Sequence, residues 1–528
     1  MGARPPPPMP DPPALQIRDT LSRELQTVTP AAHAPDGSPL LRFYSCGPTV
    51  YSYAHIGNFR TFLTADLLVR TARALGWTVR YVSNVTDVGH LTDDDLADGA
   101  GEDKMARALA SKSGERFETV WDLARHYTEA LVADWRALNL VEPDLRPRAT
   151  EHVREQIRAA QALVERGHAY ETDDGVYFSV PSFPGYGKLS GNTDADALDT
   201  GAAAAGRAIV TDDGKRDPRD FALWKKDAGH LMQWHSPFDQ GATGGWGFPG
   251  WHLECSVMAQ KYLGETIDLH GGGEDLRFPH HECEIAQAEA LTGRPFSRFW
   301  MHTRFLQVEG AKMAKSAGNF LTVRDLTVPA EGGGRGDWGA PVDPLALRLA
   351  LMKGHYGKPL DFTKRALTDA VKNRRRLAEA AELVAEALDA GRAGDDLLAG
   401  PLRSQADAAL AAMADDLGTP AALAAALAGT TAILSAARDA GLSAASAASA
   451  QTFLERIDAL LGIVGLGAET APADADPLAE QVEALIAART EARAAKDWAR
   501  ADALRDEIDA LGVEIMDAPA GTTWRRKA

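Results

Sequence analysis

Residues 41–85 constrain the fold more than any other part of the chain. The apolar run 43–46 is typical of the end of a strand, 58–75 has the spacing of a helix, and 79–82 is typical of another strand. A strand, a helix and a second strand in this order predict a unit of a parallel sheet. Ligands of such sheets gather at the carboxyl ends of the strands, where the end of the first strand and His55 both fall.

The remainder of the chain changes character twice. Residues 149–167 predict a helix, and 170–246 form a loop-rich stretch that we expect to be inserted into the sheet. From 345 to about 466 the chain is rich in Ala, Leu, Arg and Glu with helical spacing, which predicts a helical bundle. A linker rich in Ala, Pro and Asp follows at 468–477, and 478–511 predicts one or two amphipathic helices.

Composition limits the class of protein. The chain has 528 residues, of which 45% are apolar and 25% charged, as in an ordinary globular protein of several domains. No apolar run reaches the length of about 20 residues that spans a membrane, and the proline-rich segment 1–13 lacks the apolar core of a secretion signal. Three cysteines and no disulfide framework predict a reducing, cytoplasmic location. A net charge of −18 argues against a protein that coats nucleic acid indiscriminately, but it allows a local basic surface.

The three cysteines lie in segments that raise the hypothesis of a metal site. Cys46 begins Cys-Gly-Pro-Thr-Val-Tyr, Cys255 ends Gly-Trp-His-Leu-Glu-Cys, and Cys283 lies within Phe-Pro-His-His-Glu-Cys-Glu. Two of these thiols with His280 and Glu284 would complete a four-ligand zinc site, since positions four apart share one helix face. The residues alone leave two ordinary readings open: a small buried apolar Cys255 and a solvated face for the His-x-x-x-Glu pair.

Two further motifs carry side chains that can stabilise negative charge. His55-Ile56-Gly57-Asn58 begins the predicted helix, and Lys312-Met313-Ala314-Lys315-Ser316 lies in a loop far along the chain. A small residue at Gly57 lets the backbone approach a nucleotide base, while an imidazole and two lysines can stabilise the charge that develops when a carboxylate attacks the α-phosphate of ATP. The lysines alone are also compatible with a solvated loop. The two motifs together, in this order, favour nucleotide chemistry.

With these motifs the chain resembles the cysteinyl-tRNA synthetases, which are class I aminoacyl-tRNA synthetases. The resemblance extends from about residue 15 to the C-terminus. The matching segments are 44–51, 55–58, 84–87, 186–190, 220–225, 250–255, 270–273, 278–282, 312–320 and, in the tail, 498–506 with Gly521 and 524–526.

This resemblance implies a fold and a reaction. The fold is an α/β Rossmann-type catalytic domain with an inserted connective domain, followed by an α-helical bundle and a small C-terminal domain. We expect a disordered leader at 1–14 and the catalytic domain at 15–345. Within the catalytic domain, the insertion is expected at about 135–245 and the lysine-loop region at about 300–340. The anticodon-region bundle is expected at 346–467, the linker at 468–477 and the C-terminal anticodon-binding domain at 478–528. The implied reaction is the ATP-dependent activation of L-cysteine and its transfer to the 3′ end of tRNA(Cys), as part of protein biosynthesis.

The resemblance also implies the site residues. One zinc per chain would lie on Cys46, Cys255, His280 and Glu284 and bind the sulfur of substrate cysteine, because zinc prefers a thiolate to a neutral hydroxyl. Mg²⁺ would accompany ATP. The residues implied to bind ATP are His55, Gly57, Asn58 and Lys315, and the implied catalytic residues are His55 and Asn58 with Lys312, Lys315 and Ser316 of a mobile loop. Those implied to surround the amino acid are Gly47, Thr86, Trp251 and His270, with Asp275 at the ribose or amino group. Those implied to contact the tRNA are Arg374, Trp524, Arg525 and Arg526.

Four features depart from the family pattern. Asn58 replaces a histidine that many relatives carry, and Ala314 replaces the usual serine, for which we expect a modest effect on loop closure. Cys283 stands where the family has asparagine. It is either a tolerated neighbour of the ligands or a thiol that competes as a ligand or oxidises with Cys255. The loop 239–248 is longer than usual.

Two alternatives compete with the synthetase. The cysteine ligase of mycothiol synthesis shares the zinc and ATP chemistry but uses an aminosugar acceptor and lacks the full tail, so residues 478–527 argue against it. A non-catalytic RNA-binding paralogue would have lost the zinc ligands or the lysines, which are all present. We expect a monomer without membrane association.

Overall fold

The computed structural model describes most of the chain in two units, residues 1–466 and 467–528, which are treated separately below. The described residues are 13–91, 102–192, 214–239, 243–314, 317–329 and 332–466, and in the second unit 482, 485–486, 488–490, 492–493, 497–511, 513–518 and 521–526.

A parallel sheet forms the centre of the first unit. Strand β4 (Pro39–Ser45) lies between β5 (Thr78–Ser83) and β11 (Ile267–Gly273), and β12 (Ser297–Thr303) flanks β11. A short β3 (Ala32–His33) pairs antiparallel with the start of β4. Every residue of β11 is buried, as expected for a strand that is covered on both faces. The predicted parallel strand–helix–strand unit is confirmed.

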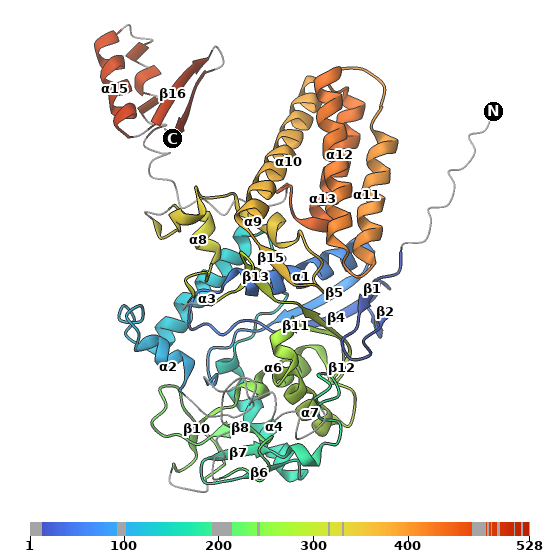
Figure 1. Ribbon diagram of the computed structural model, residues 1–528, viewed down its shortest axis with the longest axis vertical. Coiled ribbons are helices and arrows are strands. Elements are labelled where there is room, and N and C mark those ends of the chain that lie inside the picture. Colours follow the sequence, from blue (N-terminus) through green and yellow to red (C-terminus); the bar gives the residue numbers. More distant parts are fainter. Residues whose placement is uncertain are drawn as a thin grey trace, which may run out of the picture. The chain divides into compact units, whose positions relative to one another are not determined.

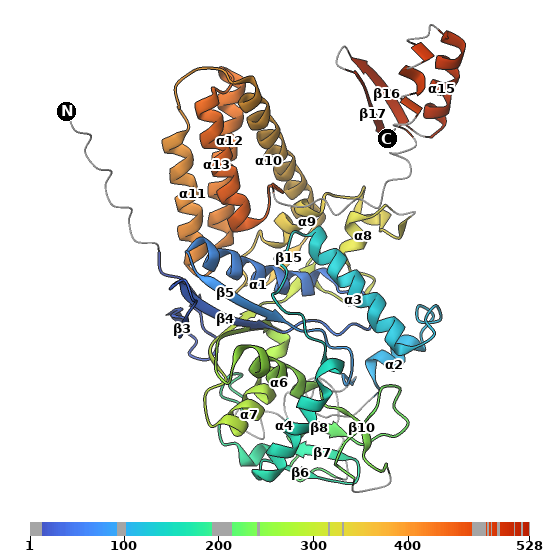
Figure 2. The same ribbon diagram turned by 180° about the vertical axis from the view of Figure 1, so that it is seen from behind.

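Helices cover the two faces of this sheet. Helix α1 (Ile56–Ala74) joins β4 to β5 on one face, where the bundle also lies, and α6 (Trp251–Leu263) and α7 (His280–Thr292) pack against each other on the opposite face (Figures 1 and 2). In registered parallel pairs Ser45 lies beside both Ser83 and Gly271, so the strands end at the same edge. The segments that leave these strand ends form the site.

An antiparallel sheet lies beyond α6 and α7, in the stretch between β5 and β11 along the chain (Figure 1). Its strands, in the order in which they pair, are β6 (Ala169–Glu171), β7 (Gly175–Phe178), β8 (Phe221–Lys225), β10 (Trp246–Pro249) and β9 (Trp234–His235). The helix predicted at 149–167 begins as a 3₁₀ turn, Ala149–His152, and continues as α4 (Val153–Glu165). The second half of the long segment 239–248 enters β10.

The bundle consists of four helices that pack along one another: α10 (Lys364–Ala390), α11 (Ala399–Ala414), α12 (Thr419–Asp439) and α13 (Ala444–Leu461). Within the described residues, α12 alone is long and apolar enough to cross a membrane by length and composition. Its buried side chains, among them Ala426 and Ile433, face α10, α11 and α13. The core of the bundle therefore accounts for its apolar composition.

Shorter elements complete the first unit. They are β1 (Gln16–Arg18), β2 (Leu25–Thr27), α2 (Lys104–Leu109), α3 (Val120–Ala137), β13 (Leu306–Val308), β14 (Ala311–Lys312), α8 (Val323–Thr327), α9 (Pro344–Leu351), β15 (Leu360–Phe362) and the 3₁₀ turns Val180–Ser182, Glu274–Arg277 and Gly336–Trp338.

The second unit combines a helix with a hairpin. Helix α15 (Trp498–Ala510) is followed by β16 (Val513–Ala518) and β17 (Gly521–Arg526), which pair antiparallel along their whole length. The sequence predicted the helix but not the hairpin. Of the predicted tRNA residues, Trp524, Arg525 and Arg526 lie on β17. The domain bounds proposed from the sequence stay predictions.

Candidate active site

A cavity of about 430 Å³ lies at the carboxyl edge of the parallel sheet. Its walls come from the segments that follow β4, β5 and β11, from the start of α6 and from the lysine loop. Ten residues singled out in the sequence line it: Cys46, Gly47, His55, Asn58, Thr86, Trp251, Cys255, Asp275, His280 and Lys312.

Three of the four predicted zinc ligands line this cavity, and the fourth, Glu284, contacts them. The sulfur of Cys46 lies 3.8 Å from that of Cys255 and 3.5 Å from Oε1 of Glu284. Nε2 of His280 lies 3.1 Å from the same carboxylate oxygen. The donor atoms of all four residues lie within 4.8 Å of one another, although three distant segments supply them.

These separations match those of tetrahedral zinc. With zinc–sulfur bonds of about 2.3 Å and zinc–nitrogen or zinc–oxygen bonds of about 2.0 Å, tetrahedral geometry places two sulfurs about 3.8 Å apart and a sulfur and an oxygen about 3.5 Å apart. Both separations occur here, between Cys46 and Cys255 and between Cys46 and Glu284. The donor set therefore fits a zinc ion.

Burial governs the protonation of the donors. Cys46, Cys255, His280 and Glu284 are each at most 4% exposed. Loss of water raises the pKa of the Cys46 thiol well above its usual range and that of Cys255 to about 12, while it lowers the pKa of His280 well below the ordinary value. Neutral imidazole is the form that binds a metal, and a divalent cation is what would favour the thiolates at such a site.

Two more histidines stand behind the ligands. His270, on β11, places Nε2 2.8 Å from Oε2 of Glu284 and stacks on Trp300. Nε2 of His281 lies 3.3 Å from the sulfur of Cys46. Both residues join Cys46 and Glu284 in a second, overlapping group of potential ligands. His270, predicted to surround the substrate, is not among the cavity's lining residues and supports the ligand carboxylate instead.

Aromatic and carboxylate side chains form the wall beside the ligands. Trp251 stacks on His280 at 4.3 Å and on His90 at 3.9 Å, between ring centres. The hydroxyl of Thr86 donates to Oε1 of Glu254. These contacts fix the wall in one arrangement and leave an amino acid little freedom to bind in other poses.

Gly47 is required by a close approach of two chain segments. A Cβ atom at this position would lie 1.7 Å from the carbonyl oxygen of Asn84, and the Gly47 N–H donates to Oδ1 of the same residue at 2.8 Å. No other side chain fits here. The glycine thus keeps the strand ends close enough for Cys46 and Thr86 to line one cavity.

The N-terminus of α1 forms the other end of the cavity. His55 caps the helix: its Nδ1 accepts from the Asn58 N–H at 3.0 Å, and Oδ1 of Asn58 accepts from the His55 N–H at 3.1 Å. Since Nδ1 is an acceptor, the proton of the neutral ring is on Nε2. Gly57 lies against this imidazole and Met313, at 2.9 and 3.2 Å from where its Cβ would be.

The lysine loop begins at β14, and Lys312 is exposed at the cavity. Asn319 closes the loop: its Oδ1 accepts from the Ala314 N–H at 2.9 Å and its Nδ2 donates to the Lys312 carbonyl at 3.1 Å. The contact to residue 314 uses the backbone, so the alanine there does not remove it. Lys315 and Ser316 lie outside the described residues.

Cys283 is fully buried, and it lies outside the ligand cluster. Its sulfur lies 3.5 Å from the hydroxyl of Tyr186, and its side chain packs into the apolar core between α4 and β8. Cys46 and Cys255 belong to a different apolar cluster. Among the described residues, neither group of potential metal ligands includes Cys283.

The basic residues proposed for tRNA differ in their surroundings. Arg374, on α10, pairs with Asp343 at 2.8 Å, and Arg376 donates to the hydroxyl of Thr431 at 2.6 Å. Lys372 and Arg375 are exposed. The side chains of β17 lie outside the described contacts, so the predicted roles of Trp524, Arg525 and Arg526 stay predictions.

Several lining residues were not predicted from the sequence. His90, Lys104 and Glu254 face the cavity, as do Tyr51 and Tyr53. Nζ of Lys104 lies 2.5 Å from Nε2 of His90. Glu254 immediately precedes Cys255, and its charge in an otherwise apolar helix start was a usable signal. Lys104 carried no such signal, because it reaches the cavity only through the packing of α2.

Two family patterns and several relatives match this chain. Residues 35–372 match the family described as tRNA synthetases class I (C) catalytic domain, and 475–525 match the cysteinyl-tRNA ligase anticodon binding domain. A relative from Salinibacter ruber, named cysteine–tRNA ligase, is 55% identical, with 98% of this chain and 99% of the relative covered. Relatives of the same name from Thermus thermophilus and Deinococcus radiodurans are 41% and 40% identical; each covers 97% of this chain, with 99% and 97% of the relatives covered.

The fold is also found in solved structures. Methionyl-tRNA synthetase from Mycobacterium tuberculosis, in complex with methionyl-adenylate, superposes with a TM-score of 0.51 at 15% identity, over 81% of this chain and 90% of that one. This likeness supports the fold alone and confirms the predicted class of an α/β catalytic domain with an insertion, a helical bundle and a small C-terminal domain. Since both family patterns match and near-full-length relatives are 40–55% identical, the chain belongs to the class I aminoacyl-tRNA synthetases, in the cysteinyl-tRNA synthetase family.

Proposed function

We propose that this protein is a ligase that activates L-cysteine with ATP and transfers it to the 3′ end of tRNA(Cys). The observation that carries the proposal is the convergence of two thiols, an imidazole and a carboxylate at one end of a cavity whose other end is a helix N-terminus with an adjacent lysine. The first end suits a thiol and the second suits phosphates.

Selection of cysteine would depend on Cys46, Cys255, His280 and Glu284. Bound zinc would supply a Lewis acid that favours the thiolate of the substrate over the hydroxyl of serine. An apolar pocket alone separates side chains of such similar size poorly. His270 would hold the Glu284 carboxylate in place through the 2.8 Å contact, as outer partners of metal ligands commonly do.

Adenylate formation would use the other end of the cavity. The substrate carboxylate attacks the α-phosphate, and pyrophosphate leaves. His55 would direct its Nε2–H, and α1 the positive end of its dipole, at the developing negative charge. Lys312, together with Lys315 and Ser316, would hold the phosphates, with Mg²⁺ accompanying ATP. Asp275, which lines the cavity, would accept a hydrogen bond from the ribose or the substrate's amino group.

Transfer to tRNA would place the terminal ribose hydroxyl at the adenylate carbonyl, with AMP as the leaving group. The match of residues 475–525 to an anticodon-binding domain supports a tRNA acceptor. It also leaves the mycothiol alternative without support, since near-full-length relatives carry the name cysteine–tRNA ligase. We further propose a cytoplasmic monomer.

Charging of purified tRNA(Cys) with labelled cysteine tests the proposal, with labelled serine run in parallel. Transfer of cysteine and not serine to tRNA is the expected result. Adenylation of cysteine without transfer, in the presence of folded tRNA, would contradict the assignment of the acceptor.

A further inference from the structure

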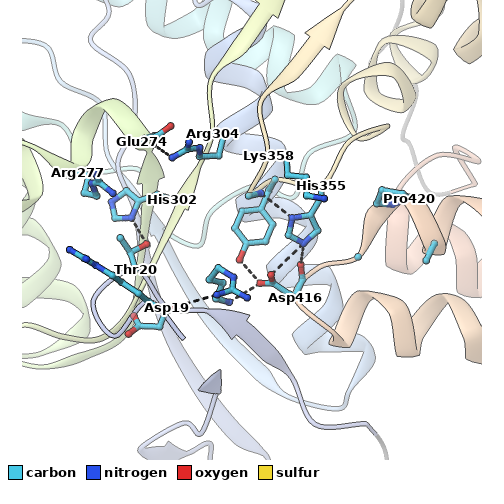
Figure 3. A pocket seen from close by; sticks show the side chains of 16 residues that line it. Asp19, Thr20, Glu274, Arg277, His302, Arg304, His355, Lys358, Asp416 and Pro420 are labelled. Carbon is cyan, nitrogen blue, oxygen red and sulfur yellow. Dashed lines mark hydrogen bonds and ion pairs between the residues drawn. The ribbon is translucent and has the colours of Figure 1, made fainter. Parts of the chain in front are cut away.

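A second cavity, of about 620 Å³, lies apart from the catalytic one (Figure 3). Five segments enclose it: the turn between β1 and β2, the 3₁₀ turn after β11, the end of β12, the loop before β15, and the start of α12. Arg277 and His302 stand on one side, with His355, Lys358 and Asp416 on the other. The cavity and the catalytic one share no lining residue.

Cations outnumber carboxylates at this cavity. Five basic side chains line it, Arg18, Arg23, Arg277, Arg304 and Lys358, against three carboxylates, Asp19, Glu274 and Asp416. In a protein with a net charge of −18 this is a local reversal of sign. Arg304 pairs with Glu274. Across the described part of the chain, the other four basic side chains form no ion pair.

The other two carboxylates, Asp19 and Asp416, already accept hydrogen bonds from the protein. Asp19 accepts from the N–H groups of Ser22 at 2.7 Å and Trp300 at 2.8 Å. Asp416 accepts from the Arg18 N–H at 2.7 Å and the Tyr356 hydroxyl at 2.5 Å. These bonds hold the walls together. Within the described residues, no carboxylate pairs with Arg277 or Lys358, which line the cavity from opposite sides.

A buried arginine fixes one wall. Arg60, on α1 and 2% exposed, donates to the carbonyl oxygens of Arg304, His355 and Lys358 at 2.5, 3.1 and 2.6 Å. The backbone that carries Lys358 is thus tied to the helix that begins at His55. The cavity is a formed site rather than a chance gap between loops.

The lining also offers surface for a flat apolar body. Pro420 and Ala421 are exposed and face the cavity from the start of α12, whereas Tyr356 is 6% exposed and forms the wall behind them. Guanidinium groups bind phosphate oxygens in pairs and also stack on planar rings. In a nucleotide, the phosphate suits the basic side chains of the lining, and the adjoining base suits its apolar surface.

We propose that this cavity binds a nucleotide phosphate, held chiefly by Arg277 and Lys358 with Arg18 and Arg23 at its rim. The nucleotide is either free or part of an RNA chain, and the chemistry of recognition is the same. The proposal concerns residues outside the active-site cavity, and only the blocking ligand used in its test rests on the proposed function.

Equilibrium dialysis on the full-length protein tests it. The active site is first filled with a non-hydrolysable sulfamoyl analogue of cysteinyl-adenylate, so that nucleoside binding there is blocked. Each of the four labelled ribonucleoside 5′-monophosphates is then added, with the unphosphorylated nucleosides in parallel. We expect one further nucleotide per chain. Binding weakens about tenfold or more in the double variant Arg277→Ala/Lys358→Ala, since two charge-assisted contacts are lost.

Arg294→Ala is the matched control, because Arg294 is an exposed arginine that does not line the cavity. Retained binding of the adenylate analogue shows that the double variant is folded. Displacement of the nucleotide by tRNA assigns the site to an RNA chain, and simultaneous binding assigns it to a free nucleotide. Absence of binding by all four nucleotides, equal binding of the nucleosides, or unchanged binding in the folded double variant would each overturn the proposal.

Discussion

The two ends of the catalytic cavity are built in opposite ways. At the amino-acid end, Cys255 and Glu284 are no more than 1% exposed, and aromatic rings and a second layer of histidines surround them. At the nucleotide end, Lys312 is exposed, and backbone contacts to Asn319 close its loop. One end is preorganised, whereas the other depends on a loop with few packed side chains.

The difference corresponds to the chemistry each end would perform. Discrimination between a thiol and a hydroxyl requires donors whose positions do not adjust to the wrong substrate, and burial in a packed core supplies this. A triphosphate must enter and pyrophosphate must leave, which a rigid buried site would hinder. Substitutions at the two ends should therefore fail in different ways.

Loss of a ligand thiol should have the largest effect. In Cys255→Ser, we expect zinc content to fall from one per chain towards zero and cysteine-dependent ATP–pyrophosphate exchange to fall by more than about 100-fold, because substitution of outer partners alone costs about 10- to 100-fold. Elemental analysis and the exchange assay measure the two quantities. Cys283→Ser is the matched control, since that thiol contacts Tyr186 and lies outside the cluster. Zinc loss in the control variant would instead restore Cys283 as a competing ligand.

Loss of the loop lysine should come next. In Lys312→Ala, the rate of adenylate formation should fall about 100-fold, as for the loss of one charge-stabilising donor, while zinc content and the KM for cysteine stay unchanged. Single-turnover kinetics measure the rate. Lys353→Ala provides an exposed-lysine control away from the cavity. An altered zinc content in Lys312→Ala would contradict the separation of the two ends.

Removal of the carboxylate's supporting histidine should have a smaller effect. His270→Ala leaves the four proposed ligands in place but frees Glu284 on one side, so we expect zinc affinity to fall about 10- to 100-fold. Competition against a chelator of known affinity measures this, with His33→Ala as the control at an exposed histidine. Unchanged affinity would show that the packing around Glu284 suffices without His270.

Restoration of the family's usual residue in the lysine loop should have the smallest effect. In Ala314→Ser, we expect less than about a twofold change in exchange rate, because the loop contact at this position is made by the backbone N–H and surface changes are usually small. Steady-state exchange kinetics test it. A gain of an order of magnitude would mean that the serine hydroxyl acts in loop closure.

The parallel sheet was accessible from the sequence, because its alternation of strand, helix and strand shows in the spacing of apolar residues. The ligand set depended on the family resemblance, since Cys255 lies on a helix that follows β10 of the antiparallel sheet and the residues alone left other readings open. His281 and Lys104 were missed because their roles arise from tertiary contacts, at 3.3 Å to Cys46 and 2.5 Å to His90. The ion pair of Arg374 was invisible for the same reason, since Asp343 caps a different helix.

The hairpin β16–β17 was also missed, although a signal existed. Val513, Glu514 and Ile515 alternate as in a strand, but Met516 breaks the alternation. The predicted helices end at residue 511, and no element was predicted for the segment that follows.

The selectivity of activation with and without the metal tests the central claim most directly. The ratio of kcat/KM for cysteine to that for serine would be measured by ATP–pyrophosphate exchange, first as purified, then after chelation, then after zinc is restored. We predict a ratio that collapses on chelation and returns with zinc, mainly through loss and recovery of cysteine activation. Discrimination that persists in the zinc-free protein would contradict selection of the substrate by the buried thiolate cluster.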